Sequence, residues 1–577
     1  MKTIRLSDVG VLPNTDITRA LHALFLAHPG DTEFFFEDAD YYLSPEGGLG
    51  ADYRLSNSAQ LPMRTLGVWM KEMKNCALRG NGARLWCRGQ MQPFTLDRCE
   101  SVTVEGFTVN WRLPLVAEAV AVGKGNGFFD IRIDAERYPH VCKNGTLYFF
   151  DGTGAEYPLL WSLIFFDPQT RRVRAGTGDI RYTSVSDLGD CVYRFTSPAA
   201  AQVTVGDLVN VRHGDRYHAG LFAEKCRDLR LADLVFHATG GLGCLVQFCR
   251  DVTIENVAFS PDEARGRAVS SGRDDGIHLA SNMGTVTVMG CRFHALMDDP
   301  MNLHGCCTLL TECVDETMLR CRFGHEEAKG FLYWAEAGDT VSFIERKTMQ
   351  SLATATVASY TLETDDTFLL TLDTPITREV QEALAEGKAL AIENLTHTAA
   401  LVCTGNHFGS GRARGLLVST PKSVLIADNV FESSGSAILI AGDANYWFES
   451  GAVRDVLITR NHFTKDCLSS SYAYSHGVIS ISPEIPAPDV ARPFHRNIRI
   501  TDNRFELTDA RLLYAASTEG LVFTGNTVLR KEGTLAEDIC LTYVRDAAVF
   551  ENTWQGARKK PMLSIKSCEA VAVEPTS

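Results

Sequence analysis

The sequence predicts an all-β protein, a right-handed parallel β-helix into which two small β-barrel-like modules are inserted. A three-residue pattern recurs along the chain: an aliphatic residue, a second one two positions later, and a bulky apolar residue seven positions after the first. The period-two alternation is typical of short strands. Several copies are 23 residues apart, as from Leu229 to Val252, which matches one minimal solenoid coil. An ordinary β-sandwich, the alternative, lacks such a fixed spacing.

Ten copies of the pattern can be placed, and six of them carry an asparagine at the sixth position. Asparagine tolerates the left-handed conformation that turns require, and stacked amides can form a hydrogen-bonded ladder. The copies begin at Val102, Leu229, Val252, Val286, Leu401, Val424, Val456, Ile498, Leu521 and Ala547. The asparagines are Asn406, Asn429, Asn461, Asn503, Asn526 and Asn552.

Two gaps between copies are too long for loops: 127 residues from Val102 to Leu229, and 115 residues from Val286 to Leu401. Each holds strand-like runs separated by turn residues, which predicts an inserted module. The predicted strands are Val120–Val122, Phe128–Ile133, Thr146–Phe150 and Leu160–Phe166 in the first gap, and Phe331–Trp334, Thr340–Ile344, Thr354–Ser359 and Thr367–Leu372 in the second, with a helix at Arg378–Glu386.

The predicted organisation therefore has five segments. An N-terminal cap, which includes Ile17–Leu26, and the first coils occupy 1–111. The first insert occupies 112–212, the central coils 213–305, the second insert 306–398 and the C-terminal coils 399–577.

Charge and composition narrow the partners. The chain has 56 Lys and Arg against 71 Asp and Glu, a net charge of −15, which argues against nucleic acid and against an acidic polymer such as pectin. A neutral ligand fits better. No apolar run is long enough to span a membrane, and no signal-peptide core follows Met1. The 17 cysteines show no spacing framework, so we expect reduced, mostly buried thiols in a cytoplasmic protein. The sequence leaves the oligomeric state open and allows a homodimer.

Two acidic clusters, 273–278 and 297–304, interrupt the coils. Asp275 lies 23 residues before Asp298 and 24 before Asp299, so coil stacking places it beside that pair, with about 4.8 Å between backbones. Stacked like charges raise the pKa of at least one member, which acid/base chemistry at neutral pH requires. A single acidic cluster of this kind is interpreted as an ordinary turn, but two clusters in coil register favour a catalytic site. In a regular strand Asp298 and Asp299 face opposite sides, so both enter one cleft only if the backbone bulges.

A third constellation combines arginines at 412–414 with an aromatic and acidic stretch at 442–451. This composition suits a sugar, because apolar ring C–H groups can stack on Trp447 while hydroxyls bond to charged groups. The alternative is a long exposed loop held by a salt bridge.

Taken together, these motifs resemble glycoside hydrolase family 110, the exo-acting α-1,3-galactosidases, over roughly residues 50–530. The residues that carry the resemblance are Asp275-x-x-His278, Met297-Asp298-Asp299-x-x-Asn302-x-His304-Gly305, Arg412-x-Arg414-Gly415-x-Leu417, Gly442-Asp443-Ala444-x-x-Trp447-x-Glu449-Ser450-Gly451, Gly89-Gln90-Met91-Gln92-Pro93-Phe94 and Asn110-Trp111-x-x-Pro114. The chain departs from the family pattern at Arg273-Asp274, where Thr-Ala is usual, at Cys306-Cys307, where Thr-Tyr is usual, and at Asn110, where Asp is more frequent.

The resemblance implies metal-free and cofactor-free hydrolysis, with inversion, of a terminal α-1,3-linked galactose on blood-group-B-type or linear α-galactosyl glycans. An inverting glycosidase needs one carboxylic acid and one water-activating carboxylate. We expect Asp275, Asp298 and Asp299 to form the catalytic group and to include the base. The acid is another member of this trio, or else Glu449 or Glu336. The residues expected to orient the sugar are His278, Asn302, His304, Arg414, Asp443 and Trp447.

Two other functions fit the same scaffold. A polysaccharide lyase would need a Lys or Arg base, usually calcium, and an acidic polymer, which the charge of −15 disfavours. A non-catalytic glycan-binding solenoid predicts that replacing each of the three aspartates by asparagine changes no activity.

Overall fold

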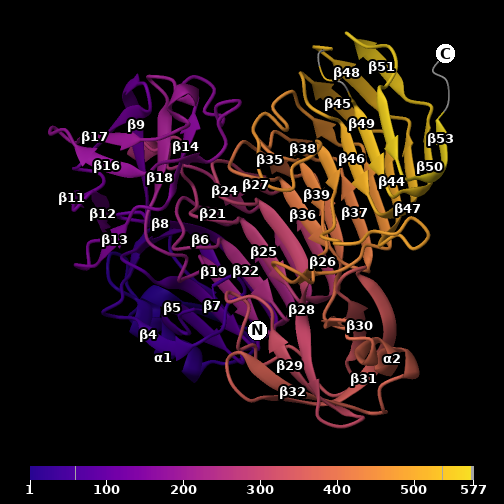
Figure 1. Ribbon diagram of the computed structural model, residues 1–577. Helices are drawn as coiled ribbons and strands as arrows, with labels where there is room; N and C mark the ends of the chain where they lie inside the picture. The colour runs from indigo at the N-terminus through magenta and orange to yellow at the C-terminus, as the bar shows by residue number, and fades with distance from the viewer. Residues whose placement is uncertain (59, 534, 536, 574–577) are drawn as a thin grey trace.

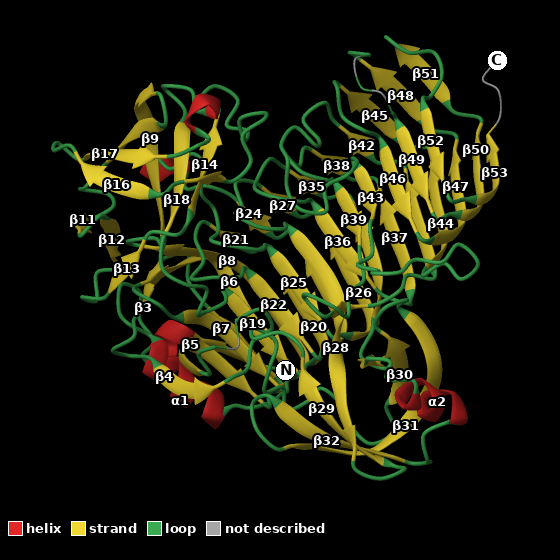
Figure 2. Cartoon of the chain, in the orientation of Figure 1, coloured by secondary structure: helices red, strands yellow, loops and turns green. Residues whose placement is uncertain are grey.

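The protein is a parallel β-helix that carries two side modules. The computed structural model describes residues 1–58, 60–533, 535 and 537–573. In Figure 1 the coils rise from the N-terminal strands at lower left to the yellow C-terminal strands at upper right, with the first insert at upper left and the second below. Strands dominate, and the described residues contain two α-helices, α1 (Thr18–Ala27) and α2 (Arg378–Ala385) (Figure 2). The predicted fold class is therefore confirmed.

Three rows of stacked strands form the coils. The long strands of the first sheet, paired in parallel, are β2 (Thr32–Phe35), β6 (Lys74–Cys87), β8 (Glu100–Trp111), β20 (Arg227–Ala232), β23 (Arg250–Glu255), β26 (Met283–Met289), β34 (Ala399–Thr404), β37 (Ser423–Ala427), β41 (Asp455–Thr459), β44 (His495–Thr501), β47 (Thr518–Thr524), β50 (Arg545–Phe550) and β53 (Glu569–Val573). Short strands continue this sheet after a turn: β21 (Val235–Phe236), β24 (Ala258–Phe259), β27 (Arg292–Phe293), β35 (His407–Phe408), β38 (Val430–Phe431), β42 (His462–Phe463), β45 (Arg504–Leu507), β48 (Thr527–Arg530) and β51 (Thr553–Gly556).

The second sheet closes each coil, and it carries the candidate site. Its parallel strands are β5 (Met63–Lys71), β7 (Gln92–Asp97), β19 (Leu221–Glu224), β22 (Cys244–Gln247), β25 (Ile277–Ala280), β28 (Met301–Cys313), β36 (Leu416–Ser419), β39 (Ile438–Ile440), β43 (Ile479–Ile481), β46 (Leu513–Ala516), β49 (Ile539–Thr542) and β52 (Leu563–Lys566). In every coil a loop leads from the short strand to the second-sheet strand.

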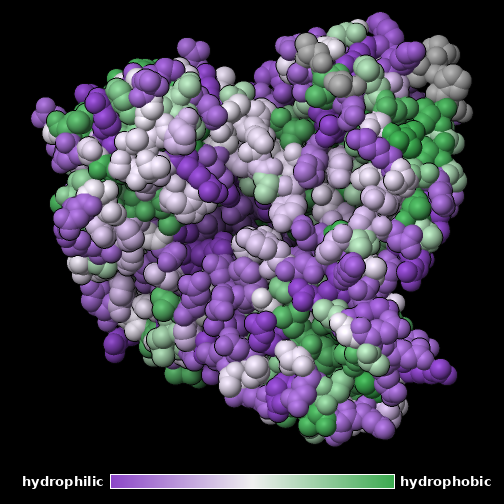
Figure 3. Space-filling model, in the orientation of Figure 1, coloured by the Kyte–Doolittle hydropathy of each residue, from purple (hydrophilic) through white to green (hydrophobic). Residues whose placement is uncertain are grey.

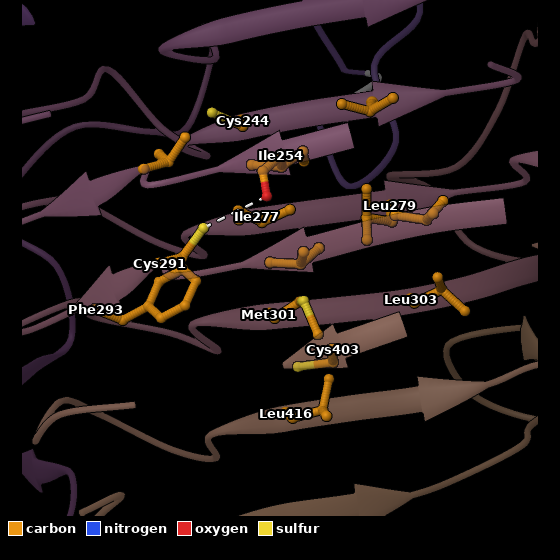
Figure 4. Packing of buried hydrophobic residues seen from close by; sticks show 14 of the residues in the cluster. Cys244, Ile254, Ile277, Leu279, Cys291, Phe293, Met301, Leu303, Cys403 and Leu416 are labelled. Atoms are coloured by element: carbon orange, nitrogen blue, oxygen red, sulfur yellow. Dashed lines mark hydrogen bonds between the residues drawn. The ribbon is translucent and has the colours of Figure 1, made fainter. Parts of the chain in front are cut away.

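The strand register follows the repeat in the sequence. Leu229 pairs with Val252, and Val252 with Val286, so equivalent positions stack on successive coils. Inside the coil, buried side chains of the two sheets meet: Ile277, Met301 and Leu416 stack on one side, across from Ile254 and other first-sheet residues (Figure 4). Removing each such side chain from water is worth roughly 1.5–3 kcal/mol. The cysteines in this core are free thiols, as the sequence predicted.

The predicted asparagine ladder is present in the C-terminal coils. The Oδ1 atom of Asn461 accepts hydrogen bonds from the backbone nitrogen of Asn429 (3.0 Å) and from its Nδ2 atom (2.9 Å). The Nδ2 atom of Asn461 donates to the carbonyl oxygen of Ile426 (2.9 Å) and to Oδ1 of Asn503 (3.0 Å). The ladder thus satisfies buried backbone groups at the turn between the long and the short strand.

Replacing Asn461 with alanine is expected to destabilise the fold by about 2–4 kcal/mol, because the backbone nitrogen of Asn429 and the carbonyl of Ile426 would lose buried partners. Urea unfolding checks this. Replacing the exposed Gln555 with alanine is the control and should change stability by less than about 0.5 kcal/mol. Equal stability of the two variants would contradict a structural role for the ladder.

The N-terminal segment contributes to the same core. Helix α1 contacts β5 and buries Leu21 and Phe25, and the ring of Phe25 packs edge-on against Phe34 at 5.1 Å. The remaining N-terminal strands are β1 (Lys2–Arg5), β3 (Asp40–Leu43) and β4 (Leu49–Asp52). Among the described residues, we find no helix with the length and apolar character that a membrane crossing requires.

The first insert is an antiparallel sheet with its own core and a small three-stranded sheet beside it. Its seven-stranded sheet has the order β15-β14-β18-β9-β10-β17-β16. The strands are β9 (Val116–Gly125), β10 (Phe128–Ile133), β11 (His140–Lys143), β12 (Thr146–Phe150), β13 (Glu156–Pro158), β14 (Ser162–Phe166), β15 (Ile180–Arg181), β16 (Ser184–Asp187), β17 (Val192–Thr196) and β18 (Leu208–Arg212).

The second insert grows out of β28, which begins in the coil and continues as an antiparallel partner of β29 and β33. Its strands are β29 (Met318–Phe323), β30 (Thr340–Glu345), β31 (Gln350–Leu362), β32 (Thr367–Leu372) and β33 (Leu390–Asn394). The predicted strand at Phe331–Trp334 is wrong. This segment is a turn in which Phe331 and Trp334 are buried and Leu332 is exposed, and Nε1 of Trp334 donates to the carbonyl oxygen of Cys306 at 3.2 Å. The two buried rings pack in the core of the insert without strand pairing.

Candidate active site

A cavity of about 210 Å³ lies over the second sheet, where the loops before β25, β28 and β36 meet. Its floor includes Asn302, Leu417 and Leu439, which are in register on three successive coils. The face in Figure 3 is hollowed near its centre, and hydrophilic residues surround the hollow. The lining comprises Asn57, Arg216, Asp275, Asp298, Asp299, Asn302, Arg412, Arg414, Leu417, Leu439, Ala441, Gly442, Asp443, Trp447, Glu449, Ala473, Tyr474, Ser482 and Glu484.

Asp275, Asp299 and Arg414 form a column across three coils. Each lies two residues before a second-sheet strand, and these strands are in register. The backbone nitrogen of Gly276 donates to the carbonyl oxygen of Asp299 at 3.0 Å, so Asp299 is the direct neighbour of Asp275. Asp298 also lines the cavity, because both aspartates lie in the loop before β28, where strand alternation does not apply. The structure thus brings all three aspartates into one cavity.

Burial and the proximity of the three carboxyls disfavour full ionisation of the acidic trio. The carboxylate of Asp299 accepts hydrogen bonds from the backbone nitrogen of Arg414 (3.1 Å) and from its Nη2 atom (2.8 Å). Burial nevertheless raises the pKa of Asp299 to about 6, against the effect of the Arg414 charge. Burial, and then the charges of Asp298 and Asp299, raise the pKa of Asp275 well above its ordinary value. Ionising all three carboxyls together is therefore unfavourable.

Asp298 is linked to the first insert through Arg412. Its Oδ1 atom lies 3.1 Å from Nη1 of Arg412, and Nε of Arg412 donates to Oδ1 of Asp179 at 2.7 Å. Asp179 belongs to the first insert, just before β15. The insert therefore helps to position a carboxyl at the cavity wall.

Behind the trio, Asp275, His278 and His304 form a buried hydrogen-bonded chain. Nδ1 of His304 lies 2.7 Å from the carbonyl oxygen of Gly305, which can only accept, so this nitrogen carries a hydrogen. Nε2 of His304 lies 3.0 Å from Nε2 of His278, and Nδ1 of His278 lies 2.8 Å from Oδ2 of Asp275. Each of these two contacts is a hydrogen bond only if one of its two atoms carries a hydrogen.

Two arrangements supply these hydrogens. Either Asp275 is protonated and both histidines are neutral, or Asp275 is ionised and His304 carries a second proton. Both contain one proton more than an ionised aspartate with two neutral histidines. Burial lowers the pKa of His278 to about 3, which disfavours a further arrangement in which His278 is the doubly protonated ring.

Glu449 lies opposite the column because β40 (Glu449–Ser450) pairs antiparallel with β28. Its carboxylate accepts from Nδ2 of Asn57 at 3.2 Å and from Nδ2 of Asn302 at 3.3 Å. Burial acts to raise the pKa of Glu449, but the neighbouring His304 and His278 and the two amide donors lower it overall. Glu449 is thus held as an ionised acceptor.

Asp443 shapes the loop that carries Trp447. Its carboxylate accepts hydrogen bonds from the backbone nitrogens of Tyr446 (3.0 Å) and Phe448 (3.0 Å), and also from that of Trp447. The Trp447 ring then packs against His325 of the second insert, with 4.6 Å between ring centroids. Both inserts therefore support side chains of the cavity wall from outside, Asp179 through Arg412 and His325 through Trp447.

Comparison with known proteins agrees with this geometry. Alpha-1,3-galactosidase B of Bacteroides thetaiotaomicron is 38% identical over 92% of this chain and 86% of that protein. The chain belongs to the α-1,3-galactosidase family, glycoside hydrolase family 110. Alpha-1,3-galactosidase A of Bacteroides fragilis is 30% identical over 92% of this chain and 88% of its own length, and alpha-1,3-galactosidase B of Akkermansia muciniphila is 31% identical over 85% and 61%. Models of GLAA-B beta-barrel domains I and II match residues 117–209 and 318–383, within the two inserts.

In this family member, most of the predicted site residues line one cavity, but three do not. Glu336 lies on the second insert in an ion pair with Lys225, outside the cavity, so it is not in place to act as the acid. His278 is fully buried and His304 is 6% exposed, and neither lines the cavity. Instead of orienting the sugar directly, as predicted, they contact Asp275 and Glu449 from behind.

The sequence prediction missed several lining residues. Asn57 comes from the loop before β5, and Arg216 from the segment that follows the first insert, where it pairs with Glu327 of the second insert. Neither lies in the repeat or in an acidic cluster, so no spacing marks them. Arg412 belongs to the motif at 412–417 that carries the family resemblance, but its two carboxylate partners, Asp179 and Asp298, are evident only in the folded chain.

Replacing Asp275 with asparagine is expected to stabilise this protein at neutral pH. Because folding raises the pKa of Asp275, its contribution favours the folded state below the unfolded pKa of about 3.9 and is lost as pH rises through the folded pKa. The amide can still donate a hydrogen bond to His278. We expect a rise in Tm on the order of 2 °C at pH 7 that vanishes near pH 4. A lower Tm at pH 7 would show that Asp275 is ionised without penalty.

Proposed function

We propose that this protein is an exo-acting glycosidase that removes terminal α-1,3-linked galactose from glycans with inversion of the anomeric carbon. The observation that carries the proposal is the column of Asp275, Asp299 and Arg414, with Asp298 beside it, in one cavity of about 210 Å³. Family membership and the name shared by the relatives support galactose as the sugar. The small volume of the cavity, whose wall residues Arg412 and Trp447 are held by the two inserts, favours one terminal sugar over the middle of a polymer.

The two carboxyls of the column are proposed to activate water together. Inverting glycosidases hold their acid and base about 6.5–9.5 Å apart, on opposite faces of the sugar. Asp275 and Asp299 lie on adjacent coils, with roughly 4.8 Å between backbones, which suits a pair that grips one water better than a pair that flanks a ring. Arg414 keeps Asp299 ionised and aimed at that water.

Asp298 is the proposed acid. Glu449 is kept ionised by its neighbours, so it is better suited to accept hydrogen bonds from sugar hydroxyls than to donate a proton. The oxygens of Asp443 are occupied by backbone nitrogens. Asp298 keeps 23% of its side chain exposed, more than the 3% of Asp299. Its ion pair with Arg412 (3.1 Å) has to open before Asp298 can hold the proton that it donates.

The buried histidines are proposed to set the charge of Asp275. Asp275 can accept the proton of the attacking water only in the arrangement in which it is ionised and His304 holds the second proton. That second proton can pass to Glu449, which lies 3.6 Å from Nε2 of His304, so the chain keeps one excess proton in total. His278 and His304 are positioning and proton-carrying residues and not sugar contacts.

Hydrolysis of galactosyl-α-1,3-galactose, followed by proton NMR, tests the proposed function. We expect β-galactose as the first product, converting later to the α form, and at least a hundredfold lower kcat/KM on α-1,4- and α-1,6-linked isomers. From a longer glycan, we expect release of the terminal galactose alone, with the rest of the glycan as one intact product. First appearance of α-galactose would contradict inversion, and no release from any galactoside would leave a glycan-binding solenoid as the function.

A further inference from the structure

A second and larger cavity, of about 530 Å³, lies between the first insert and the coils. Its walls come from the chain that leads into the insert (110–114), from two loops of the insert, and from the loop between β24 and β25. It shares no lining residue with the cavity that holds the acidic trio. Any ligand bound here is therefore held by separate groups.

This cavity is basic in an acidic protein. Two carboxyls lie among its lining residues, Glu136 and Asp151, and both oxygens of Asp151 accept hydrogen bonds within the insert, one from Thr153 and one from Tyr157. The chain as a whole has a net charge of −15, so a local excess of positive charge stands out. The lining arginines are Arg88, Arg112, Arg137, Arg265 and Arg267.

Two of these guanidinium groups are free to bind. In the part of the chain that the structure describes, Arg112 and Arg265 form no ion pair and donate no side-chain hydrogen bond. The guanidinium of Arg265 lies over the ring of Trp86, 5.1 Å from its centroid, which restrains it while its N–H groups remain available. A planar guanidinium offers two parallel donors to a carboxylate or sulfate.

Arg267, deeper in the wall, is a buried charge without an ion-pair partner among the described residues. It is 6% exposed, and it donates to the side chain and carbonyl of Ser270 and to the carbonyl of His237, all neutral groups. Two carboxylates, Glu118 and Asp262, lie near enough to favour its charge, but burial lowers the pKa of Arg267 overall. Glu118 is held by the backbone nitrogens of Ala268 and Val269, and Asp262 by Nδ2 of Asn110. An anion in the cavity would therefore offset part of the cost of burying this cation.

We propose that this cavity binds the anionic group of an acidic sugar, a carboxylate or a sulfate. Arg112 and Arg265 are the direct ligands, and Arg267 supplies positive charge from the wall. The cavity is larger than the one over the second sheet, so it can admit the sugar that carries the anion as well as the anion itself. Because no residue is shared, this site does not depend on the proposed hydrolysis.

Titration calorimetry of the full chain with 3′-sialyllactose, sulfated lactose, lactose and inorganic sulfate tests this site. We expect saturable binding of at least one acidic sugar, at least tenfold tighter than lactose or sulfate and weakened by added salt. The double variant Arg112→Ala/Arg265→Ala should weaken it at least tenfold. The control Arg378→Ala, on an exposed helix residue, should not change it.

Three results would overturn the proposal: no saturable binding of either acidic sugar, equal binding of lactose, or binding that survives the double variant. Binding of inorganic sulfate as tight as that of the acidic sugars would also overturn it, since the site would then take a free anion. Unchanged hydrolysis of galactosyl-α-1,3-galactose by the double variant shows that it is folded. If neither the wild-type protein nor the double variant hydrolyses that sugar, a Tm equal to that of the wild-type protein shows that the double variant is folded. The binding result does not depend on hydrolysis.

Discussion

Replacing Asp299 with asparagine is expected to lower kcat on galactosyl-α-1,3-galactose by about 10³-fold, within the 10²–10⁴ range for loss of a general acid or base. The amide cannot accept the proton of the attacking water, yet it is nearly the same size and keeps one oxygen for Arg414. KM should change little, because the sugar-binding groups across the cavity are untouched. Single-turnover and steady-state kinetics measure both quantities.

The matched control for this variant is Asp546→Asn, at an exposed position in the C-terminal coils, which should retain wild-type kcat. Circular dichroism and Tm show whether each variant is folded. If Asp299→Asn retains more than a tenth of wild-type kcat while folded, Asp299 is not the water-activating group. If Asp275→Asn and Asp298→Asn also retain full activity, hydrolysis does not take place in this cavity.

Replacing Asp298 with asparagine is expected to have an effect that depends on the leaving group. On galactosyl-α-1,3-galactose, whose leaving oxygen needs a proton, kcat should fall about 10³-fold. On 2,4-dinitrophenyl α-galactoside, which leaves without protonation, the loss should be less than about tenfold. Asp299→Asn should lose activity on both substrates, because each needs an activated water.

The comparison of the two substrates decides the role of Asp298. An equal loss on the two substrates would show that Asp298 is not the proton donor. Glu449→Gln would then be the next variant to compare.

The sequence predicted the parts of the molecule that repeat. Because a strand alternates with period two and a coil has a minimal length, the spacing of Leu229 and Val252 fixes their register. The same reasoning placed Asp275 beside the 298–299 pair and predicted the asparagine ladder at Asn461.

The sequence did not predict contacts made by chain that leaves the coils. Strand β40 lies in the loop between β39 and β41, pairs with β28 and brings Glu449 to the cavity. Glu336 of the second insert instead pairs with Lys225. Arg216 and Asn57 likewise arrive from loops with no periodic position. Spacing predicts stacking within the solenoid, but it carries no information on where an insert folds back.

The buried hydrogen-bonded chain of Asp275, His278 and His304 could not be predicted from the sequence either. His278 and His304 are in motifs that resemble a sugar site, and polar residues in such motifs are ordinarily expected to contact the ligand. Whether a histidine faces the cavity or the carboxylate behind it depends on side-chain direction, which the hydrogen bonds to Asp275 and Gly305 reveal.

A crystal structure of Asp299→Asn with galactosyl-α-1,3-galactose tests most directly whether stacked coils build the hydrolytic site. We predict that the terminal galactose fills the cavity over the second sheet, with its anomeric carbon facing position 299 and Asp298 within hydrogen-bond distance of the glycosidic oxygen. A disaccharide bound only in the arginine-lined cavity, or with its anomeric carbon turned away from Asp275 and position 299, would contradict this.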